Sequence, residues 1–488
     1  MSQSKKILLL VPPFYRLYDS AYPSKFYPHA LGYLGATVHK ETDWEVMTYN
    51  PNFCPVGKAG KAMNYELFAT EGFNKYLHNL NDFSYTVWKE VERTILEFAP
   101  SVVGISVNAT TSGSAAGVAK LAKSINPAIT VVVGGPHPSL VGAQVFSCKE
   151  IDICVKGEGE RTIVELLNAL EKGRALETIP GLVLRKGDKI IETAPRELIT
   201  DLDSLCFPHE SAPRILKDYE RYPFSALSGI FTGRGCPFDC FFCGSSYLWG
   251  HQVRSRSVDN VLRQMQSLRR EGASWVHFED DTFGADRDFI TDLCRAMIAD
   301  GDNIRWGCQS HVRLIDAEIL KLMKRAGCEL IFLGVESGNN NILKAQGKQV
   351  TIEESFAACR LIRKTGMAVA TFFMIGFPQE TESTLADTVR AIRKIKSDHI
   401  VFSVFTPYPG TAAFALCVSL GLIVDNYDPS LYNHQSPLNY FCPQIPKPEF
   451  HAQVLKIARI VDSKNACAAI RWKILHPFLS SILYTDSI

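Results

Sequence analysis

The chain has 488 residues, of which 46% are hydrophobic and 21% charged, so it is long and apolar enough for two or three cored domains and is not a disordered protein. Its 52 basic residues nearly balance its 51 acidic ones. The charge balance therefore provides no overall field that would attract nucleic acid or an anionic membrane, and a small or neutral substrate fits it better.

Signals for secretion and for membrane insertion are weak in this sequence. The apolar run 7–11 ends at two prolines and is too short for the core of a signal peptide, so it predicts a buried strand. The longest other apolar run, 414–424, is interrupted by Ser419 and Gly421 and falls short of the roughly 20 residues that span a bilayer. Fourteen cysteines without a secretory signal favour a reducing compartment. We expect a cytoplasmic protein with no integral membrane association.

Residues 1–170 alternate short apolar runs with amphipathic segments, which is typical of a doubly wound parallel sheet. Covering helices are expected at 111–125 and 161–170. The pattern therefore predicts a Rossmann-like α/β domain. Its expected strands are 7–11, 44–49, 102–107, 129–133 and 153–155.

The rest of the chain divides into three parts. Residues 171–227 hold a hairpin-like pair of runs and a proline-rich stretch, and are expected to be a linker. Six βα units across 228–410 predict a partial (β/α)6 barrel, with an open sheet as the alternative. Residues 411–488 are helical, aromatic and rich in proline, and are expected to form a small C-terminal cap over the substrate. The expected barrel strands are 230–232, 275–279, 305–309, 330–335, 369–375 and 400–405.

Three closely spaced cysteines, Cys236, Cys240 and Cys243, form the most informative motif of the chain. Soft thiolates at this C-x3-C-x2-C spacing can bind three irons of a 4Fe-4S cluster and leave the fourth iron without a protein ligand. A zinc knuckle is the alternative, and it needs a closed set of four ligands. Possible fourth ligands exist, but none lies at the usual zinc spacing: Cys206, His209 and His251. The spacing therefore favours a cluster with one open iron.

This motif, with the aromatic Phe242 directly before its third cysteine, resembles that of the radical S-adenosylmethionine (SAM) superfamily. In that family the open iron chelates SAM, and an electron from the cluster cleaves SAM to a 5′-deoxyadenosyl radical. The resemblance implies that Cys236, Cys240 and Cys243 are the catalytic metal ligands and that Phe242 lies on the adenine side. The motif follows the first expected barrel strand, at the face where barrel active sites are built.

Four further motifs follow later barrel strands in the same register. By the resemblance, the acidic pair after the second strand would meet the SAM amino group, and the third-strand pair its ribose and carboxylate. The glutamate after the fourth strand would face the SAM pocket, and the glycine after the fifth would let the backbone approach adenine. Any one motif alone is compatible with ordinary turn or capping chemistry. In that order, these candidates are Glu279 with Asp280, Ser310 with Arg313, Glu336, and Gly376.

Glycines and prolines also follow the strands of the first domain, at the edge where open α/β sheets bind ligands. Upstream of a radical SAM barrel, these turns resemble the cobalamin-binding domain of class B radical SAM enzymes, and the resemblance covers about residues 5–410. The sequence has no Asp-x-His-x-x-Gly motif, so the resemblance implies cobalamin bound without a histidine ligand. A Rossmann-like domain without a cofactor is the alternative. The candidate contacts to the cobalamin tail are Ser106, Asn108, Thr110, Gly134 and Gly135.

The resemblance implies a cobalamin-dependent methyltransferase acting on an unactivated carbon of a small molecule, with methylcobalamin as methyl donor and flavodoxin or ferredoxin as electron donor. A cyclase or rearrangement enzyme shares every motif, and a cobalamin- or cluster-based sensor is a third class. Nucleic-acid substrates are disfavoured because residues 411–488 carry no basic cluster. If these residues are only a lid, deleting the chain after Thr411 should leave cluster assembly and cobalamin binding intact while uncoupling turnover.

Overall fold

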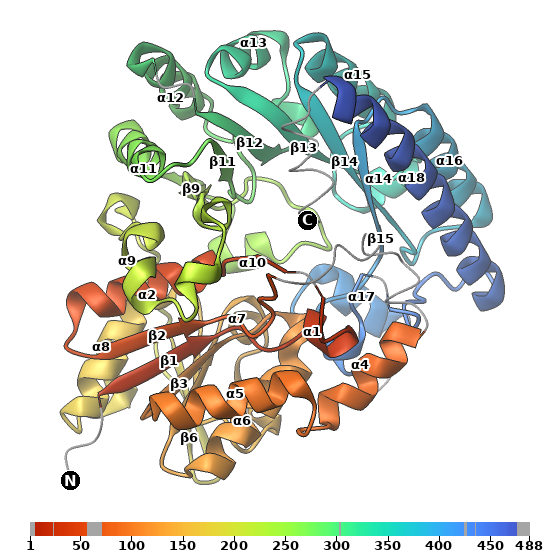
Figure 1. Ribbon diagram of the computed structural model, residues 1–488. Helices are drawn as coiled ribbons and strands as arrows, with labels where there is room; N and C mark the ends of the chain where they lie inside the picture. Colours follow the sequence, from red (N-terminus) through yellow and green to blue (C-terminus); the bar gives the residue numbers. More distant parts are fainter. Residues whose placement is uncertain are drawn as a thin grey trace. The chain divides into compact units, whose positions relative to one another are not determined.

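The computed structural model describes residues 5–22, 24–55, 71–301, 304–423, 427–434 and 436–475. The chain divides into two compact units, one running up to Leu227 and the other from Ser228 onward, while the short segment Asp428–Leu431 groups with the first unit. Each unit is built on its own sheet, and Figure 1 shows the elements of both. The division falls where the sequence pattern changes from the expected linker to the expected barrel.

The first unit contains a seven-stranded sheet in the order β2-β1-β3-β4-β5-β6-β7. Strands β1 to β5 are parallel, and β6 and β7 are added antiparallel. The order reverses between β1 and β3, which is the switch point at which doubly wound sheets bind ligands. This is the doubly wound α/β fold predicted from the sequence. The strands are β1 Lys6–Leu10, β2 Glu45–Tyr49, β3 Val102–Ser106, β4 Thr130–Gly134, β5 Ile153–Val155, β6 Leu182–Lys186 and β7 Lys189–Glu192.

Helices cover both faces of this sheet, so the parallel strands bury both sets of side chains and are nearly continuous apolar runs. Helices α2, α8 and α9 pack together on one face, where their buried residues form a core with strands β1 to β6. Helices α4, α5 and α6 pack together on the other face (Figure 1). The helices are α1 Tyr15–Tyr18, α2 His29–Glu41, α4 Glu71–Asn81, α5 Thr86–Phe98, α6 Ser112–Ile125, α7 Pro136–Val141, α8 Gly159–Glu171 and α9 Pro208–Ile215.

The segment expected to be a linker, 171–227, is instead an integral part of the first unit. Its hairpin β6–β7 extends the sheet, with Cys154 of β5 opposite Val183 of β6. Its helix α9 packs on α2 and places Ile215 in the core. The hairpin was visible in the sequence, but its pairing with β5 is a long-range contact that local patterning does not reveal.

The second unit contains six parallel strands, each beside its neighbour in the chain, in the order β15-β14-β13-β12-β11-β8. This sequential order is that of a barrel left open between its first and last strands, as the six βα units predicted. The carboxyl ends of all six strands therefore lie on one edge, where the cysteine motif follows β8. The strands are β8 Gly229–Ile230, β11 Trp275–Phe278, β12 Arg305–Ser310, β13 Cys328–Glu336, β14 Ala368–Ile375 and β15 His399–Val404.

Most helices of the second unit begin at a polar residue whose side chain accepts a hydrogen bond from the first turn, which satisfies otherwise unpaired backbone donors. Thr351 and Thr381 form full capping boxes. The helices are α10 Ser245–Trp249, α11 Val258–Arg270, α12 Arg287–Asp300, α13 Ala317–Arg325, α14 Asn340–Ala345, α15 Ile352–Lys364, α16 Glu382–Lys394, α17 Ala412–Ser419 and α18 Lys447–Leu475. None of the described helices is long and apolar enough to cross a bilayer.

The C-terminal tail covers the edge strand β15 of this sheet. The Asn465 side chain of α18 donates to the backbone oxygen of Ile400 at 2.8 Å and accepts from its N–H at 2.9 Å. Lys464 donates to the carbonyls of Ile392 and Ile395 at the end of α16, and Figure 1 shows α18 running beside α16. A sheet edge left open is a site of aggregation, so the tail contributes to the stability of the unit as well as covering it.

Candidate active site

The cysteine loop lies between β9 (Gly233–Arg234) and helix α10, and β9 pairs with the short strand β10 (Arg254–Ser255). Gly235 has a φ of +109°, and a Cβ there would lie 2.2 Å from the carbonyl oxygen of Gln252. Only glycine fits this position. The backbone therefore turns sharply before Cys236, and the loop begins at the carboxyl edge of the barrel strands.

The three thiols are free and half-buried in this one loop. The sulfur of Cys236 lies 3.1 Å from the Thr282 hydroxyl, and the sulfur of Cys243 accepts a hydrogen bond from the Ser245 N–H at 3.5 Å. In the described part of the chain, no three His, Cys, Asp or Glu side chains converge on one position for a single metal ion. The three thiolates of a 4Fe-4S cluster bind three different irons.

A buried ion pair lies near the cysteine loop. Lys348 and Glu336 are 6% and 7% exposed, and the Lys348 Nζ lies 3.1 Å from Glu336 Oε1. Gly334 makes room for the pair, because a Cβ there would lie 2.6 Å from Nζ. Glu336 itself has a φ of +64°, a left-handed conformation that non-glycine residues seldom adopt and that is enriched at functional sites.

The charge of Lys348 acts on the cysteine thiols. Burial raises the pKa of Cys240 to about 11 and raises that of Cys243, whereas the Lys348 ammonium lowers the pKa of both. Burial alone would lower the pKa of Lys348, but Glu336 and Cys240 raise it, so the ammonium stays charged. A cluster binds thiolates, and a fixed positive charge beside the thiols favours their deprotonation.

The backbone of Phe241, at the centre of the loop, is anchored on both sides. Its N–H donates to the carbonyl of Gln346 at 3.1 Å, and its carbonyl accepts from the N–H of Ala413 at 3.0 Å. Gln346 precedes Lys348 in the same turn, and Ala413 lies in the first turn of α17. The segment after α14 and the start of the tail therefore both fix the loop.

The two residues of the acidic motif lie in different environments. Glu279 is half-buried at the end of β11. Asp280 is 6% exposed, and its Oδ1 accepts from the N–H groups of Thr232 (2.6 Å) and Gly233 (3.1 Å), while its Oδ2 accepts from the Thr232 hydroxyl. Burial raises the pKa of Asp280 to about 6. Its carboxylate therefore holds the entry to the cysteine loop, and this role competes with the expected contact to the SAM amino group.

The candidates of the third strand also have protein partners. The Ser310 hydroxyl donates to the carbonyl of Phe283 at 2.9 Å and so ties β12 to the acidic loop. Arg313 donates to the side chain of Gln349 at 2.7 Å, directly after Lys348. Between them, His311 stacks on Phe238 of the cysteine loop at 3.7 Å between ring centroids. The motif therefore lies beside the cysteine loop and the Lys348 turn.

The two candidates on the adenine side come together. The ring centroids of Phe242 and Phe377 lie 5.8 Å apart, and Phe377 directly follows Gly376. Gly376 has a φ of +95°, and a Cβ there would lie 2.9 Å from the ring of Phe450 in α18. Its N–H donates to Glu380, a fully buried carboxyl whose pKa burial raises to about 8. The β14 turn is thus fixed by Glu380 and by the tail.

The first unit gathers its candidates at the carboxyl edge beside the switch point. Ser106 at the end of β3 lies opposite Gly134 at the end of β4, and Gly135 has a φ of +105°. Asn108 and Thr110 lie at the turn that opens α6, where the Asn108 backbone N–H donates to the Thr111 hydroxyl at 3.0 Å. Ser106, Gly134 and Gly135 therefore meet at adjacent strand ends, and Asn108 and Thr110 follow in the next turn.

Three residues that shape the site had no role in the sequence interpretation: Lys348, Glu380 and Thr282. A lysine twelve residues after Glu336 carries no local signal of a buried pair, since lysine is ordinarily exposed. Glu380 lies in a Pro-Gln-Glu-Thr turn that resembles an ordinary helix start. Only the fold shows that these side chains are buried.

Comparison with known proteins shows the family of this chain. Residues 230–392 match the radical SAM superfamily model, and residues 58–167 match that of the B12 binding domain. An uncharacterized methyltransferase of Pyrococcus horikoshii is 34% identical over 340 residues, covering 69% of this chain and 73% of that protein. The chain belongs to the cobalamin-dependent radical SAM family. It is therefore a radical SAM enzyme, as predicted.

Two further matches define the breadth of this family. The anaerobic magnesium-protoporphyrin IX monomethyl ester cyclase of Cereibacter sphaeroides is 30% identical over 364 residues, covering 72% of this chain and 58% of that protein. The radical SAM methyltransferase TsrM of Kitasatospora setae, solved with cobalamin and a 4Fe-4S cluster, has a TM-score of 0.70 at 19% identity, covering 94% of this chain and 89% of that one. The latter match shows the shared fold.

The cofactors of this radical SAM enzyme are a 4Fe-4S cluster, SAM and cobalamin. The residues present fit them. Three free thiols in one loop beside a buried lysine suit a cluster, and the glycines at the carboxyl end of β4, beside the switch point of the sheet, suit cobalamin.

Proposed function

We propose that this radical SAM enzyme is a methyltransferase that places a methyl group on an unactivated carbon of a small molecule. The observation that carries the proposal is the cysteine loop fixed beside the Lys348–Glu336 pair, in a chain that also has a B12-binding domain. The 34% identity to a protein described as a methyltransferase supports it. When bound, the cluster supplies the electron that cleaves SAM, and cobalamin carries the methyl group.

The residues of the chain have distinct parts in this proposal. Cys236, Cys240 and Cys243 hold the cluster, and Lys348 supplies positive charge beside it. Glu279, Ser310, Arg313 and Glu336 surround the position expected for SAM, with Phe242 and Gly376 on the adenine side. The first unit holds cobalamin through Ser106, Asn108, Thr110, Gly134 and Gly135.

A cyclase is the second candidate, because a relative at 30% identity carries that activity. The test follows a labelled methyl group. Protein with reconstituted cluster and cobalamin is given reductant, SAM labelled in its methyl group, and a panel of small-molecule extracts. A methyltransferase forms S-adenosylhomocysteine and a product that carries the label. A product without the label, formed with 5′-deoxyadenosine alone, would replace the proposal by the cyclase.

A cluster-free variant provides the control for this test. Replacing Cys236, Cys240 and Cys243 by alanine should remove the visible absorbance of the cluster and stop 5′-deoxyadenosine formation. A variant that keeps a full complement of iron and sulfide would contradict the assignment of the ligands.

We further propose that the enzyme works in the cytoplasm with a flavodoxin or ferredoxin as electron donor. All fourteen cysteines are free, which suits a reducing compartment. Reduction of the cluster by either protein, measured as bleaching of its absorbance, tests the choice of donor.

A further inference from the structure

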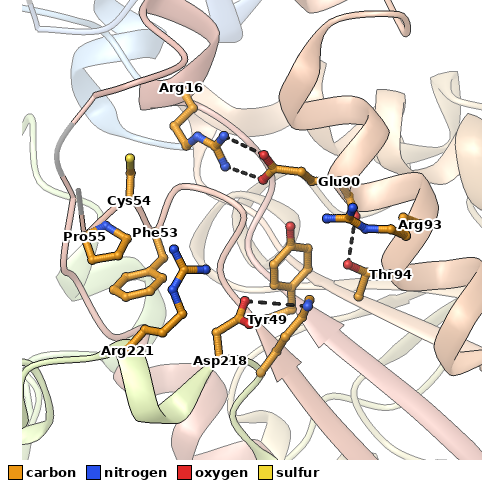
Figure 2. Close-up of a pocket in the computed structure, with 11 residues that line it drawn as sticks. Arg16, Tyr49, Phe53, Cys54, Pro55, Glu90, Arg93, Thr94, Asp218 and Arg221 are labelled. Atoms are coloured by element: carbon orange, nitrogen blue, oxygen red, sulfur yellow. Dashed lines mark hydrogen bonds and ion pairs between the residues drawn. The ribbon is translucent and has the colours of Figure 1, made fainter. Parts of the chain in front are cut away.

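The first unit contains a cavity of about 250 Å³ that none of the candidate cobalamin residues lines. It lies between the carboxyl end of β2, helix α5 and the turn after α9 (Figure 2). Tyr49, the last residue of β2, forms part of its wall. The volume is below the roughly 300 to 1,000 Å³ of pockets for drug-sized ligands, so the cavity suits a smaller molecule.

One wall of the cavity is a buried and fully paired arginine. Arg16 is 7% exposed and binds Glu90 through two parallel hydrogen bonds of 2.5 and 2.8 Å. It also donates to the carbonyls of Ser20 and Pro51, at 2.9 and 3.0 Å. A guanidinium held by this many bonds has a fixed position, and Glu90 balances its charge.

The remaining charges leave an excess of positive charge. Four cationic side chains and two carboxylates line the cavity. Glu90 pairs with Arg16, and Asp218 lies 3.6 Å from Lys217. Within the described ranges, Arg93 and Arg221 form no ion pair with a carboxylate, although both line the same hollow. Figure 2 shows the guanidinium groups of Arg16, Arg93 and Arg221 around the ring of Tyr49.

The aromatic wall holds one of these arginines in place. The Arg221 guanidinium lies 5.8 Å from the ring centroid of Phe53, and that ring stacks on Tyr222 at 3.6 Å. Among the described residues, no carboxylate forms an ion pair with the Arg221 guanidinium that this ring supports. Arg93 and Arg221 face one small cavity beside the fixed Arg16, an arrangement suited to a dianion with several acceptor oxygens.

We propose that this cavity binds the phosphate group of a small anionic ligand, either free phosphate or a phosphomonoester. A phosphate carries between −1.5 and −2 charges near neutral pH and three strong acceptor oxygens. Arg93 and Arg221 supply the matching charge and paired donors, while Arg16 and Tyr49 form part of the wall. The lining residues do not include the candidate cobalamin contacts at the ends of β3 and β4.

The test is calorimetric titration of the full-length protein, loaded with cluster and cobalamin, with inorganic phosphate and, separately, with glycerol 3-phosphate. We expect one saturable site per chain, and the tighter of the two ligands identifies the source of the phosphate group. Arg93→Gln and Arg221→Gln should each weaken binding about tenfold or more, because each removes a charge-assisted contact. Both side chains are exposed, so these variants should fold normally.

Control experiments distinguish specific binding in this cavity from non-specific electrostatic attraction of anions. Arg174→Gln, an exposed arginine of the same unit outside the cavity, should leave the affinity unchanged. Sulfate should compete, whereas chloride at equal ionic strength should not. The proposal is overturned by the absence of saturable binding, by unchanged affinity in the Arg93→Gln/Arg221→Gln double variant, or by binding to cobalamin-free protein that disappears when hydroxocobalamin is added.

Discussion

At the scale of single residues, the site depends on polar side chains removed from water. Lys348 and Glu336 are both nearly inaccessible, and the Lys348 Nζ lies 3.1 Å from Glu336 Oε1. Breaking such a pair by removing one member leaves an uncompensated buried charge, which costs more than the pair gains by forming.

We expect Lys348→Met to lower the free energy of unfolding of the second unit by about 3–5 kcal/mol, because Glu336 is left buried without its partner. The measurement is urea unfolding of the cluster-free protein. The double variant Lys348→Met/Glu336→Gln should recover most of the loss. Lys344→Met, an exposed lysine of α14, should change stability by less than about 0.5 kcal/mol. Equal losses in the single and double variants would contradict the coupling.

Asp280 gives a second prediction at this scale. If its carboxylate holds the cysteine loop, Asp280→Ala should leave the backbone donors of Thr232 and Gly233 unpaired, cost about 1–3 kcal/mol and lower the iron bound after reconstitution. If it instead binds the SAM amino group, cluster content should stay normal and only SAM affinity should fall. Iron and sulfide analysis together with SAM titration distinguishes the two roles of Asp280, and Glu279→Gln serves as the comparison variant.

At the scale of elements, short turns after the barrel strands determine the geometry of the site. The β14–α16 turn is held by Glu380, whose Oε2 accepts the N–H groups of Gly376 and Phe377. Burial raises the pKa of this carboxyl to about 8 from a usual 4.5. The folded state therefore retains a proton that the unfolded chain has already released at neutral pH.

This raised pKa makes the stability of the turn depend on pH. The contribution of protonated Glu380 is fully present below pH 4.5 and is lost as the pH rises toward 8, with a slope of at most about 1.4 kcal/mol per pH unit. Glu380→Gln keeps an acceptor and has no proton to lose, so its unfolding free energy should fall less over this window. Urea unfolding at pH 5, 6, 7 and 8 checks the difference; parallel curves would contradict it.

At the scale of the whole chain, the tail is part of the second unit and more than a lid. Asn465 satisfies both backbone groups of Ile400 on the edge strand, and Ala413 fixes the cysteine loop through Phe241. These contacts argue against the expectation that deletion after Thr411 leaves cluster assembly intact. A role in covering the substrate stays a prediction beside this structural one.

We therefore expect deletion of residues 412–488 to prevent cluster assembly and to yield aggregated protein, because the edge of β15 becomes open. A milder variant keeps the test informative. Asn465→Ala should lower stability by about 1–3 kcal/mol, since it leaves the Ile400 groups unpaired, whereas exposed Lys456→Ala in the same helix should have no effect. Full iron content in a soluble truncated protein would contradict the structural role and support the hypothesis that the tail is only a lid.

The sequence by itself determined the chemistry and most of the elements. The spacing of Cys236, Cys240 and Cys243 is local, so it is legible without a fold, and the parallel strands follow from short apolar runs with both faces buried. The order of βα units also predicted two parallel-stranded domains with the candidate residues after their strands. The structure confirms the two sheets.

Only the tertiary structure decided which polar side chains meet. It paired Lys348 with Glu336, and it directed both carboxylate oxygens of Asp280 to hydrogen bonds with Thr232. It also joined the expected linker to the first sheet and placed the tail along β15. Each of these depends on contacts between residues distant in the chain. Sequence periodicity reports which face of an element is apolar, but it carries no record of the partner that a buried charge or an open strand edge will find.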